Sequence, residues 1–364
     1  MIIDSIKLEN FRNYPSLKLK FDSGTNIFYG DNAQGKTNIL ESVYVCGTTK
    51  SHRSSKDREM IRFEQEESHI RMKIIRGGSP VKIDMHLRKN KTKGIAINGV
   101  PIRKASELFG VANFVFFSPE DLNIIKNGPG ERRRFVDMEL CQLSRVYMHN
   151  LANYNKIVNQ RNKLLKEIGF RPDFMDTLDI WDMQMVEYGR KVIEERAVFI
   201  SRLNEIMREI HGKLSGNREE ILVTYDANVQ AEAFEETLRR NRDRDLKFKV
   251  SLIGPHRDDI GFQIKHVDIR KFGSQGQQRT AALALKLSEI ELVRQELGDT
   301  PILLLDDVLS ELDSHRQGYL LDSIHDIQTL ITCTGLDDFV NNHFSINQVF
   351  KVVNGSIVCE KEKI

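Results

Sequence analysis

The chain has 364 residues, 40% of them hydrophobic, and its 54 basic and 52 acidic side chains leave a formal net charge of only +2. No run of about 18 apolar residues occurs, so the sequence predicts no membrane span. The four cysteines are scattered without a C-x-x-C pair, so their spacing suggests neither a zinc site nor a disulfide framework. We expect a cytoplasmic protein in which any affinity for nucleic acid comes from local basic patches.

The first third of the chain predicts strands interrupted by one helix. Apolar residues alternate with polar ones in several stretches, and Asn98-Gly99 between two apolar runs is a strong hairpin signal. The expected elements are strands at 2–8 and 17–21 around a turn at 13–16, a strand at 26–29, a helix after 36, an antiparallel sheet over 68–103, a strand at 113–117 and a helix start at 118–119.

A phosphate loop with the pattern G-x-x-x-x-G-K-[ST] lies between that short strand and that helix. Its members are Gly30, Asp31, Asn32, Ala33, Gln34, Gly35, Lys36 and Thr37. The glycines let backbone N–H groups turn inward, so the loop and the helix N-terminus can hold a polyphosphate. Lys36 would contact the β- and γ-phosphates, and the Thr37 hydroxyl would ligate Mg²⁺. The sequence therefore predicts a protein that binds a nucleoside triphosphate.

Beyond the strand at 113–117, apolar residues recur at helical spacing in two long stretches. Residues 169–173 separate them. Strict heptads are not kept, so we expect an antiparallel helical pair rather than a long coiled coil. We assign residues 129–244 to an inserted helical lobe, and residues 1–128 with 245–364 to a discontinuous α/β head.

The segment Phe-Gly-Ser-Gln-Gly-Gln-Gln-Arg at 272–279 opens another predicted helix. Ser274 followed by Gln277 has the form of a capping box, which would account for both residues. Capping leaves Gly276 unexplained, because glycine in a helix costs up to about 1 kcal/mol relative to alanine. A small residue there suits the close approach of another group, and exposed N–H groups with a serine hydroxyl suit a γ-phosphate.

Four apolar residues, 302–305, precede Asp306 and Asp307 and predict a buried strand whose carboxyl end lies beside the phosphate loop. Asp306 would hold Mg²⁺ with Thr37, directly or through water. Asp307 points the other way and would reach an attacking water as acceptor or base. A plain strand and turn would also give this pattern. The complete phosphate loop upstream favours the catalytic interpretation.

These motifs, with Ser-Glu-Leu-Asp at 310–313, occur in the order of ATP-binding-cassette ATPases. The chain resembles the RecF family of bacterial DNA replication and repair proteins, which is related to the SMC-type ATPases. The stretches that carry this resemblance are 8–14, 30–40, 131–135, 254–259 and 273–280. The resemblance implies an ATP-binding-cassette head of the α/β class with an antiparallel β subdomain and the inserted helical lobe.

Three departures from the wider cassette pattern bear on catalysis. Gln275 stands where transporters carry glycine, Asp307 where they carry glutamate, and Thr332-Cys333-Thr334 replaces the usual switch histidine. A shorter carboxylate held farther from the water predicts slow hydrolysis. We therefore expect a weak, DNA-stimulated ATPase in which ATP acts as a switch.

The resemblance also implies partners. In cassette ATPases the signature, here Ser274, Gly276 and Gln277, contacts the ATP held by the opposing subunit. One phosphate loop and one signature per chain then imply a homodimer with two ATP molecules in its interface. The implied substrate is duplex DNA or a single-strand/duplex junction, clamped by the dimer. RecR, with RecO in the same pathway, would be the protein partner in loading recombinase at gaps during DNA damage and the SOS response.

Contacts with DNA are less defined. The candidates are the basic residues Lys50, Arg53, Lys56, Lys91 and Arg132. A charge run is more often a solvated face, and Arg133 or Arg134 could instead be an internal ion-pair partner. His256 and Arg257 stay open between a structural network and a part of the nucleotide site.

Two other classes of protein contain a phosphate loop. An ATPase subunit of another cassette machine, such as a transporter, would need a docking surface for membrane helices. The helical insertion and Gln275 argue against it. A P-loop kinase would need a lid with catalytic arginines and gives no reason for a Ser-Gln-Gly-Gln helix. We therefore expect an ATP-dependent DNA-binding protein of replication and recombinational repair, associated with the nucleoid.

Overall fold

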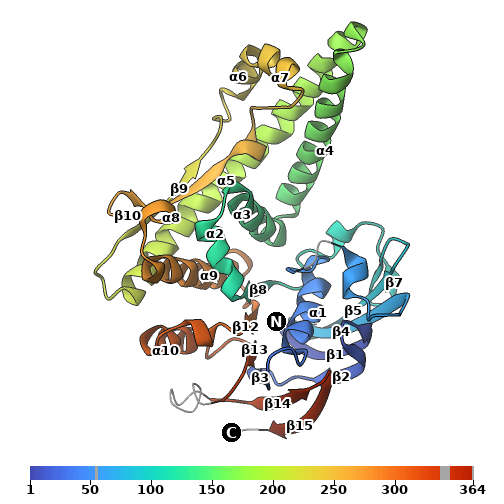
Figure 1. The fold of residues 1–364 in the computed structure, drawn as a ribbon, viewed down its shortest axis with the longest axis vertical. Coiled ribbons are helices and arrows are strands. Elements are labelled where there is room, and N and C mark those ends of the chain that lie inside the picture. The colour runs from blue at the N-terminus through green and yellow to red at the C-terminus, as the bar shows by residue number, and fades with distance from the viewer. Residues whose placement is uncertain (54–55, 337–344, 363–364) are drawn as a thin grey trace. The chain divides into compact units, whose positions relative to one another are not determined.

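The computed structural model describes residues 1–53, 56–336 and 345–362 (Figure 1). The chain divides into two compact units. We call Met1–Asp121 with Val293–Ile364 the head unit, and Leu122–Leu292 the helical unit. Among the described residues, no helix combines the length and the apolar character needed to cross a bilayer.

The head unit contains an antiparallel six-stranded sheet in the order β2-β1-β4-β5-β6-β7. Its strands are β1 (Ile2–Phe11), β2 (Tyr14–Lys20), β4 (Glu67–Arg76), β5 (Ser79–Arg88), β6 (Gly94–Ile97) and β7 (Val100–Pro101). Asn98 and Gly99 have the positive φ values that their two-residue hairpin needs. The strand pair expected at 2–8 and 17–21 and the antiparallel sheet expected over 68–103 belong to one sheet, because β1 pairs with β4. The turn of the strand pair lies at Arg12 and Asn13, earlier than predicted.

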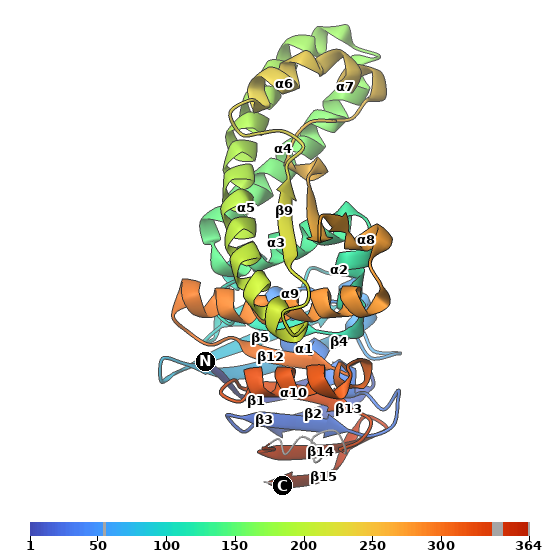
Figure 2. The same cartoon turned by 90° about the vertical axis from the view of Figure 1, so that its left-hand side faces the viewer.

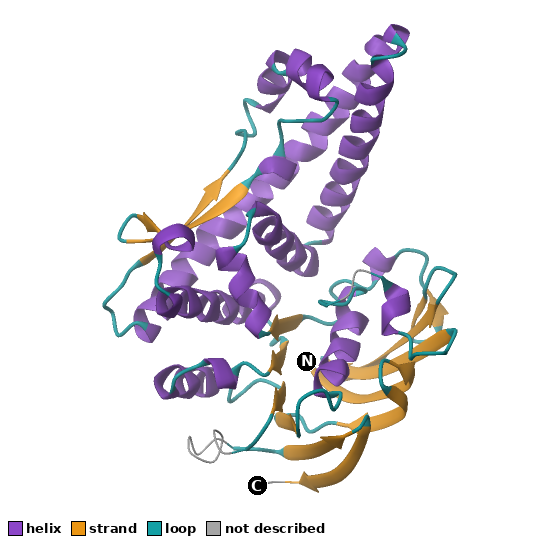
Figure 3. Ribbon diagram, in the orientation of Figure 1, coloured by secondary structure: helices purple, strands orange, loops and turns teal. Residues whose placement is uncertain are grey.

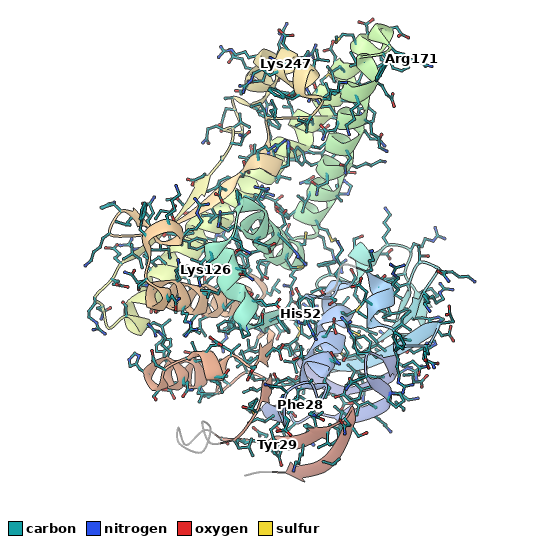
Figure 4. The ribbon with its side chains drawn as sticks, viewed as in Figure 1. Phe28, Tyr29, His52, Lys126, Arg171 and Lys247 are labelled. Carbon is teal, nitrogen blue, oxygen red and sulfur yellow. The ribbon has the colours of Figure 1, made fainter. Side chains whose placement is uncertain are left out.

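A second six-stranded sheet of the head unit has the order β15-β14-β3-β13-β12-β8. Its strands are β3 (Thr25–Tyr29), β8 (Phe114–Phe117), β12 (Ile302–Asp306), β13 (Thr329–Cys333), β14 (Gln348–Val353) and β15 (Ser356–Glu362). All neighbours except β14 and β15 are parallel, so the carboxyl ends of β3, β13 and β12 meet at one edge. Phe28 of β3, which is labelled in Figure 4, stacks on Phe350 of β14 with ring centroids 4.9 Å apart.

Helix α1 (Lys36–Thr48) follows β3 and contributes to the core that both sheets of the head unit share. Ile39, Leu40 and Val43 are fully buried and form the apolar face of this helix. Because α1 begins at the end of β3, its N-terminus lies at the edge where the parallel strands end. The remaining short elements are η1 (Asp57–Met60), η2 (Ala105–Glu107), η3 (Pro119–Asp121), η6 (Leu309–Glu311) and α10 (Ser314–Ser323).

The helical unit is dominated by α4 (Arg145–Ile168) and α5 (Leu178–Leu214), which lie side by side (Figures 2 and 3). They form the expected antiparallel pair, with a break at Gly169 where one was predicted. The other elements are α2 (Leu122–Lys126), α3 (Pro129–Leu143), η4 (Pro172–Thr177), α6 (Phe234–Arg240), α7 (Arg242–Phe248), η5 (Pro255–Arg257), α8 (Ile269–Phe272) and α9 (Gln275–Leu297), together with the strands β9 (Ile221–Asp226), β10 (Asp259–Ile264) and β11 (Val267–Asp268).

The boundary between the units differs from the expected one at residue 245. Strand β9 pairs with β10 in antiparallel register from Ile221↔Ile264 to Asp226↔Asp259, which ties the segment after 245 to the helical unit. This sheet, in the order β11-β10-β9, has no counterpart in the sequence prediction.

Candidate nucleotide site

At two positions, the phosphate loop has a backbone conformation that only glycine tolerates. Gly30 and Gly35 have φ values of 148° and 111°, in the range that disfavours other residues. A Cβ atom on Gly30 would lie 2.4 Å from the carbonyl oxygen of Val352, and one on Gly35 would lie 2.5 Å from Nδ2 of Asn13. Asp31, Asn32 and Ala33 between them are exposed. The loop is therefore fixed in shape at both ends and open in the middle.

Residues distant in sequence hold this loop from outside. The Nδ2 of Asn13 donates to the carbonyl of Gln34 over 3.1 Å, and the Tyr14 hydroxyl donates to the carbonyl of Gly35 over 3.1 Å. From the β14–β15 turn, the N–H of Gly355 donates to the same Gln34 carbonyl over 3.0 Å. The sequence prediction did not include these supports, although Asn13 and Tyr14 lie within the first stretch of the resemblance.

Lys36 is 7% exposed, and its ammonium group donates to the carbonyls of Gly30 and, over 2.9 Å, of Asp31. The charge of Lys36 is therefore held at the phosphate loop by neutral backbone groups. A phosphate oxygen that enters the loop would give this ammonium a charge-assisted hydrogen bond, which is stronger than one to a carbonyl.

Thr37 and Asp306 meet at the edge where the parallel strands end. The Thr37 hydroxyl donates to Oδ1 of Asp306 over 2.8 Å, and the Thr332 hydroxyl of β13 donates to the same atom over 2.7 Å. Hard oxygen ligands of this kind suit Mg²⁺, which is usually held by one or two protein groups and phosphate oxygens. The residues present therefore fit the ion, with Thr37 and Asp306 as its protein-side holders. Thr332 stands in the segment that lacks the switch histidine.

Asp307 directly follows the strand and has a φ of 53°, so its backbone leaves the direction of β12. Its N–H donates to the Thr332 hydroxyl over 3.0 Å and to the Thr332 carbonyl over 3.2 Å. Burial raises the pKa of its carboxyl above the usual value. Lys36 opposes the rise in pKa, and Asp306 adds to it. A half-buried carboxyl with a raised pKa suits a proton acceptor better than an ordinary surface aspartate does.

The signature residues lie in the helical unit, at the start of α9. The Ser274 N–H donates to Oε1 of Gln277 over 2.9 Å, and the Gln277 N–H donates to the Ser274 hydroxyl over 3.2 Å, so the capping box is formed. Gln277 also donates to Glu219 over 2.8 Å. A Cβ atom on Gly276 would meet only the Ser274 hydroxyl, at 3.8 Å. Packing among the described residues thus gives no reason for glycine there.

Four of the five candidate DNA contacts are exposed: Lys50, Arg53, Lys56 and Lys91. The prediction for Arg132 is wrong. Its side chain is 2% exposed and bonds both carboxylate oxygens of Asp259, over 2.6 and 3.1 Å. It also donates to the carbonyls of Asn127, over 2.6 Å, and Ile124, over 3.3 Å.

The rotation of α3 explains the error at Arg132. A helix turns 100° per residue, and here Arg132 shares the buried face with Phe135 and Val136. Its neighbour Arg133 is half-buried and donates to the carbonyl of Asp258 over 2.6 Å, whereas Arg134 is exposed. The internal ion pair that we considered for Arg133 or Arg134 is thus made by Arg132.

His256 and Arg257 belong to a structural network of the helical unit. Nε2 of His256 lies 2.9 Å from the Ser251 carbonyl, which can only accept, so Nε2 carries the proton. Nδ1 then accepts from the Tyr154 hydroxyl over 2.6 Å. Burial lowers the pKa of His256 to about 4, which keeps this arrangement neutral. Arg257 donates to the same Ser251 carbonyl over 3.1 Å.

Comparison with known proteins identifies the family. The family model described as the RecF/RecN/SMC N terminal domain matches residues 2–357. A "DNA replication and repair protein RecF" of Lachnospira eligens is 60% identical over 362 residues, which span 99% of this chain and 100% of the relative. The chain belongs to the RecF family. Membership in this family overturns the two alternatives, a transporter subunit and a P-loop kinase.

Solved structures agree on the fold. The "recombination mediator protein RecF-ATP in RecFOR pathway" has a TM-score of 0.92 and 34% sequence identity, and the match covers 100% of this chain and 97% of that one. An Smc head bound to the C-winged helix domain of ScpA has a TM-score of 0.58 at 15% identity, over 100% and 98% of the two chains, which shows the fold alone. The predicted class, an ATP-binding-cassette head with an antiparallel β subdomain and an inserted helical lobe, is confirmed.

Proposed function

We propose that this protein is an ATP-gated DNA-binding protein of replication and recombinational repair, in which two copies close around two ATP molecules. The observation that carries the proposal is the 2.8 Å hydrogen bond between Thr37 and Asp306. It joins the phosphate loop and the end of β12 in one half-site. The name of the RecF relatives and the ATP state of the matching solved structure support the same conclusion.

Within one copy, each residue has a separate task. The loop N–H groups and Lys36 bind the β- and γ-phosphates of ATP. Thr37 and Asp306 would hold Mg²⁺, which neutralises charge between these phosphates when bound. Asp307 accepts the proton of the attacking water, and its raised pKa makes it a stronger base than an ordinary aspartate.

The second half of each site comes from the other copy. We assign to Ser274, Gly276 and Gln277 a contact with the γ-phosphate of the partner's ATP. Ser274 is exposed, and its hydroxyl accepts a weak hydrogen bond of 3.2 Å from the Gln277 N–H, so a phosphate can compete for it. The bare Cα of Gly276 lets a phosphate approach the N–H groups of α9. Loss of the γ-phosphate removes these bonds and lets the two copies separate.

The closed dimer then clamps duplex or gapped DNA at the cytoplasmic nucleoid. Lys50, Arg53, Lys56 and Lys91 supply phosphate contacts, which fix position without reading sequence. Slow, DNA-stimulated hydrolysis resets the clamp. The reference to the RecFOR pathway in the matching solved structure supports RecR, with RecO, as the partners in loading recombinase at gaps.

Complementation between inactive variants tests the shared site. Lys36→Met should lose ATP binding, and Ser274→Arg should bind ATP but block the approach of the partner. In a mixed dimer one composite site carries both lesions and the other carries none, so about half of the activity per heterodimer should return. Lys18→Met, at an exposed lysine of β2, serves as the control and should keep the ATPase activity of the parent without any partner variant. Heterodimers that form without any recovered ATPase activity would contradict the shared site.

A further inference from the structure

The solvent-facing side of the antiparallel sheet carries a pair of stacked histidines outside the nucleotide site. His69 of β4 and His86 of β5 are directly opposite each other in the strand register. Their ring centroids are 4.0 Å apart and their planes differ by 19°. Ile70 and Met85, the next residues on each strand toward the other face, are buried, so the histidines project away from the core. Their side chains are 47% and 33% exposed, respectively.

Glu67, two residues before His69 on the same face of β4, reaches both rings. Its Oε2 lies 2.9 Å from Nε2 of His86, and its Oε1 lies 3.8 Å from Nε2 of His69. One ligand atom from each of the three side chains lies within 4.8 Å of the other two. Among residues 1–53, 56–336 and 345–362, this is the one group of three such ligands that lies so close together.

Neighbouring charges leave this group free to take a cation. Lys7 is paired with Glu9 over 2.7 Å, and Arg71 is paired with Asp84 over 2.5 Å. Arg88, which is opposite Glu67 in the strand register, donates to the Thr92 carbonyl over 2.9 Å. A hollow of about 450 Å³ adjoins the two rings, which leaves room for a water molecule. The arrangement thus offers two imidazole nitrogens, one carboxylate and an open side.

We propose that Glu67, His69 and His86 form a binding site for a divalent transition-metal ion, of which Zn²⁺ is the representative, and that this ion clips β4 to β5. Two nitrogens and one oxygen with a fourth position left to water is a familiar zinc set, and imidazole favours such metals over Mg²⁺. Tetrahedral zinc holds its nitrogens about 3.3 Å apart. Exposed side chains can reach that spacing by small rotations. The site is separate from the all-oxygen Mg²⁺ site at Thr37 and does not depend on the proposed function.

Titration of the full-length, nucleotide-free protein with Zn²⁺ in Mg²⁺-containing buffer tests the site by calorimetry. We expect one Zn²⁺ per chain. Loss of an outer-shell partner alone costs 10- to 100-fold in affinity, so Glu67→Gln should weaken binding by at least about tenfold. His69→Gln/His86→Gln together should abolish the saturable binding. The matched control is His315→Gln, an exposed histidine at the start of α10, which should bind as the parent does.

A thermal melt with and without Zn²⁺ gives a second measurement. The metal should raise the melting temperature of the parent and of His315→Gln, and leave that of the double variant unchanged. Without metal, the double variant should melt as the parent does, because exposed polar side chains contribute little to stability. Absence of saturable Zn²⁺ binding by the parent, or equal binding by the double variant, would overturn the proposal and leave an ordinary hydrogen-bonded Glu–His pair.

Discussion

The phosphate-loop site of the head unit and the ionic network of the helical unit both contain a cation and aspartates, but the partners of these charged groups differ. In the helical unit, Arg196 bonds Asp258 over 3.0 Å and Asp137 over 2.7 Å, and both Arg196 and Asp258 are buried. In the site, Lys36 is held by backbone carbonyls and Asp306 by two hydroxyls. The charges of this network neutralise one another, whereas Lys36 and Asp306 of the site are held by neutral groups.

The difference separates binding charges from structural ones. A charge held by neutral partners keeps its field for a ligand, whereas the field of a buried ion pair offsets the desolvation of its own two charges. Arg132 shows why sequence alone does not distinguish them. It begins a basic run of the kind that binds phosphate, yet Asp259 neutralises it inside the helical unit.

Lys36→Met should have the largest effect, because it removes the charge that we propose binds the γ-phosphate. ATP binding should fall to background, and with it every ATP-dependent property. Equilibrium binding of labelled ATP and the rise of the melting temperature with ATP are the measurements. Lys18→Met should bind ATP as the parent does. A Lys36→Met protein that binds ATP with unchanged affinity would place the charge of Lys36 among the structural ones.

Asp307→Asn should slow hydrolysis by about 10²- to 10⁴-fold, the usual contribution of a general base, with ATP still bound. Only the carboxylate form of Asp307 can accept the proton, and burial raises its pKa. As the pH is lowered, the parent should therefore lose hydrolysis at a higher pH than an enzyme whose base is an ordinary aspartate. Single-turnover rates over a pH series measure both effects. Asp322→Asn, an exposed site on α10, is the control. Unchanged turnover in Asp307→Asn would remove it from the mechanism.

Arg196→Met tests the other side of the comparison. It leaves Asp258 buried without its cation, so the free energy of unfolding should drop by about 3–5 kcal/mol. Adding Asp258→Asn should recover part of this loss, because the fully buried carboxylate is then uncharged and only the partly exposed Asp137 has lost its cation. Arg208→Met breaks the exposed pair with Glu220 and should cost about 1 kcal/mol or less. Urea unfolding followed by far-ultraviolet circular dichroism gives the values, and equal losses in the two single variants would refute the distinction.

Neutralising Lys50, Arg53 and Lys56 to glutamine should have the smallest effect. For each phosphate of duplex DNA that the variant no longer neutralises, the slope of log K against log salt should flatten by roughly 0.9. Binding should weaken evenly across sequences, while ATP binding survives. Fluorescence anisotropy with a gapped duplex over a salt series, with and without ATP, measures the slope. Lys265→Gln, an exposed lysine of the helical unit, is the control. A slope unaffected by the triple substitution would place the DNA surface elsewhere, with Lys91 next to be tested.

Local patterns were sufficient for much of the fold. Alternation, the Asn98-Gly99 hairpin and the strand–loop–helix context predicted most strands of the head unit and the loop itself. These local patterns could not predict contacts between residues that are far apart in the sequence. Strand β1 joins β4 some 65 residues on, and Arg132 meets a carboxylate 127 residues away. The alternation of Ile260, Phe262 and Ile264 was the available signal for the missed sheet of the helical unit.

The site was predictable where one motif holds all of its parts. The loop glycines and Lys36 are such residues, since spacing alone predicts that they share one loop, as they do in the structure. Asn13 and Gly355 support the loop from turns that become neighbours only in the folded head unit, so local sequence could not reveal them. The capping box at Ser274 forms as its pattern predicts, but this hydrogen bond does not decide whether the serine also binds phosphate.

Sedimentation velocity with ATP and gapped DNA tests the central claim most directly. We expect a monomer without nucleotide, and a dimer that carries DNA when ATP is present. Asp307→Asn should hold that dimer longest, whereas Lys36→Met and Ser274→Arg should sediment as monomers with or without ATP. A parent protein that stays monomeric with ATP and DNA, or that forms the same dimer without ATP, would contradict the ATP-gated clamp.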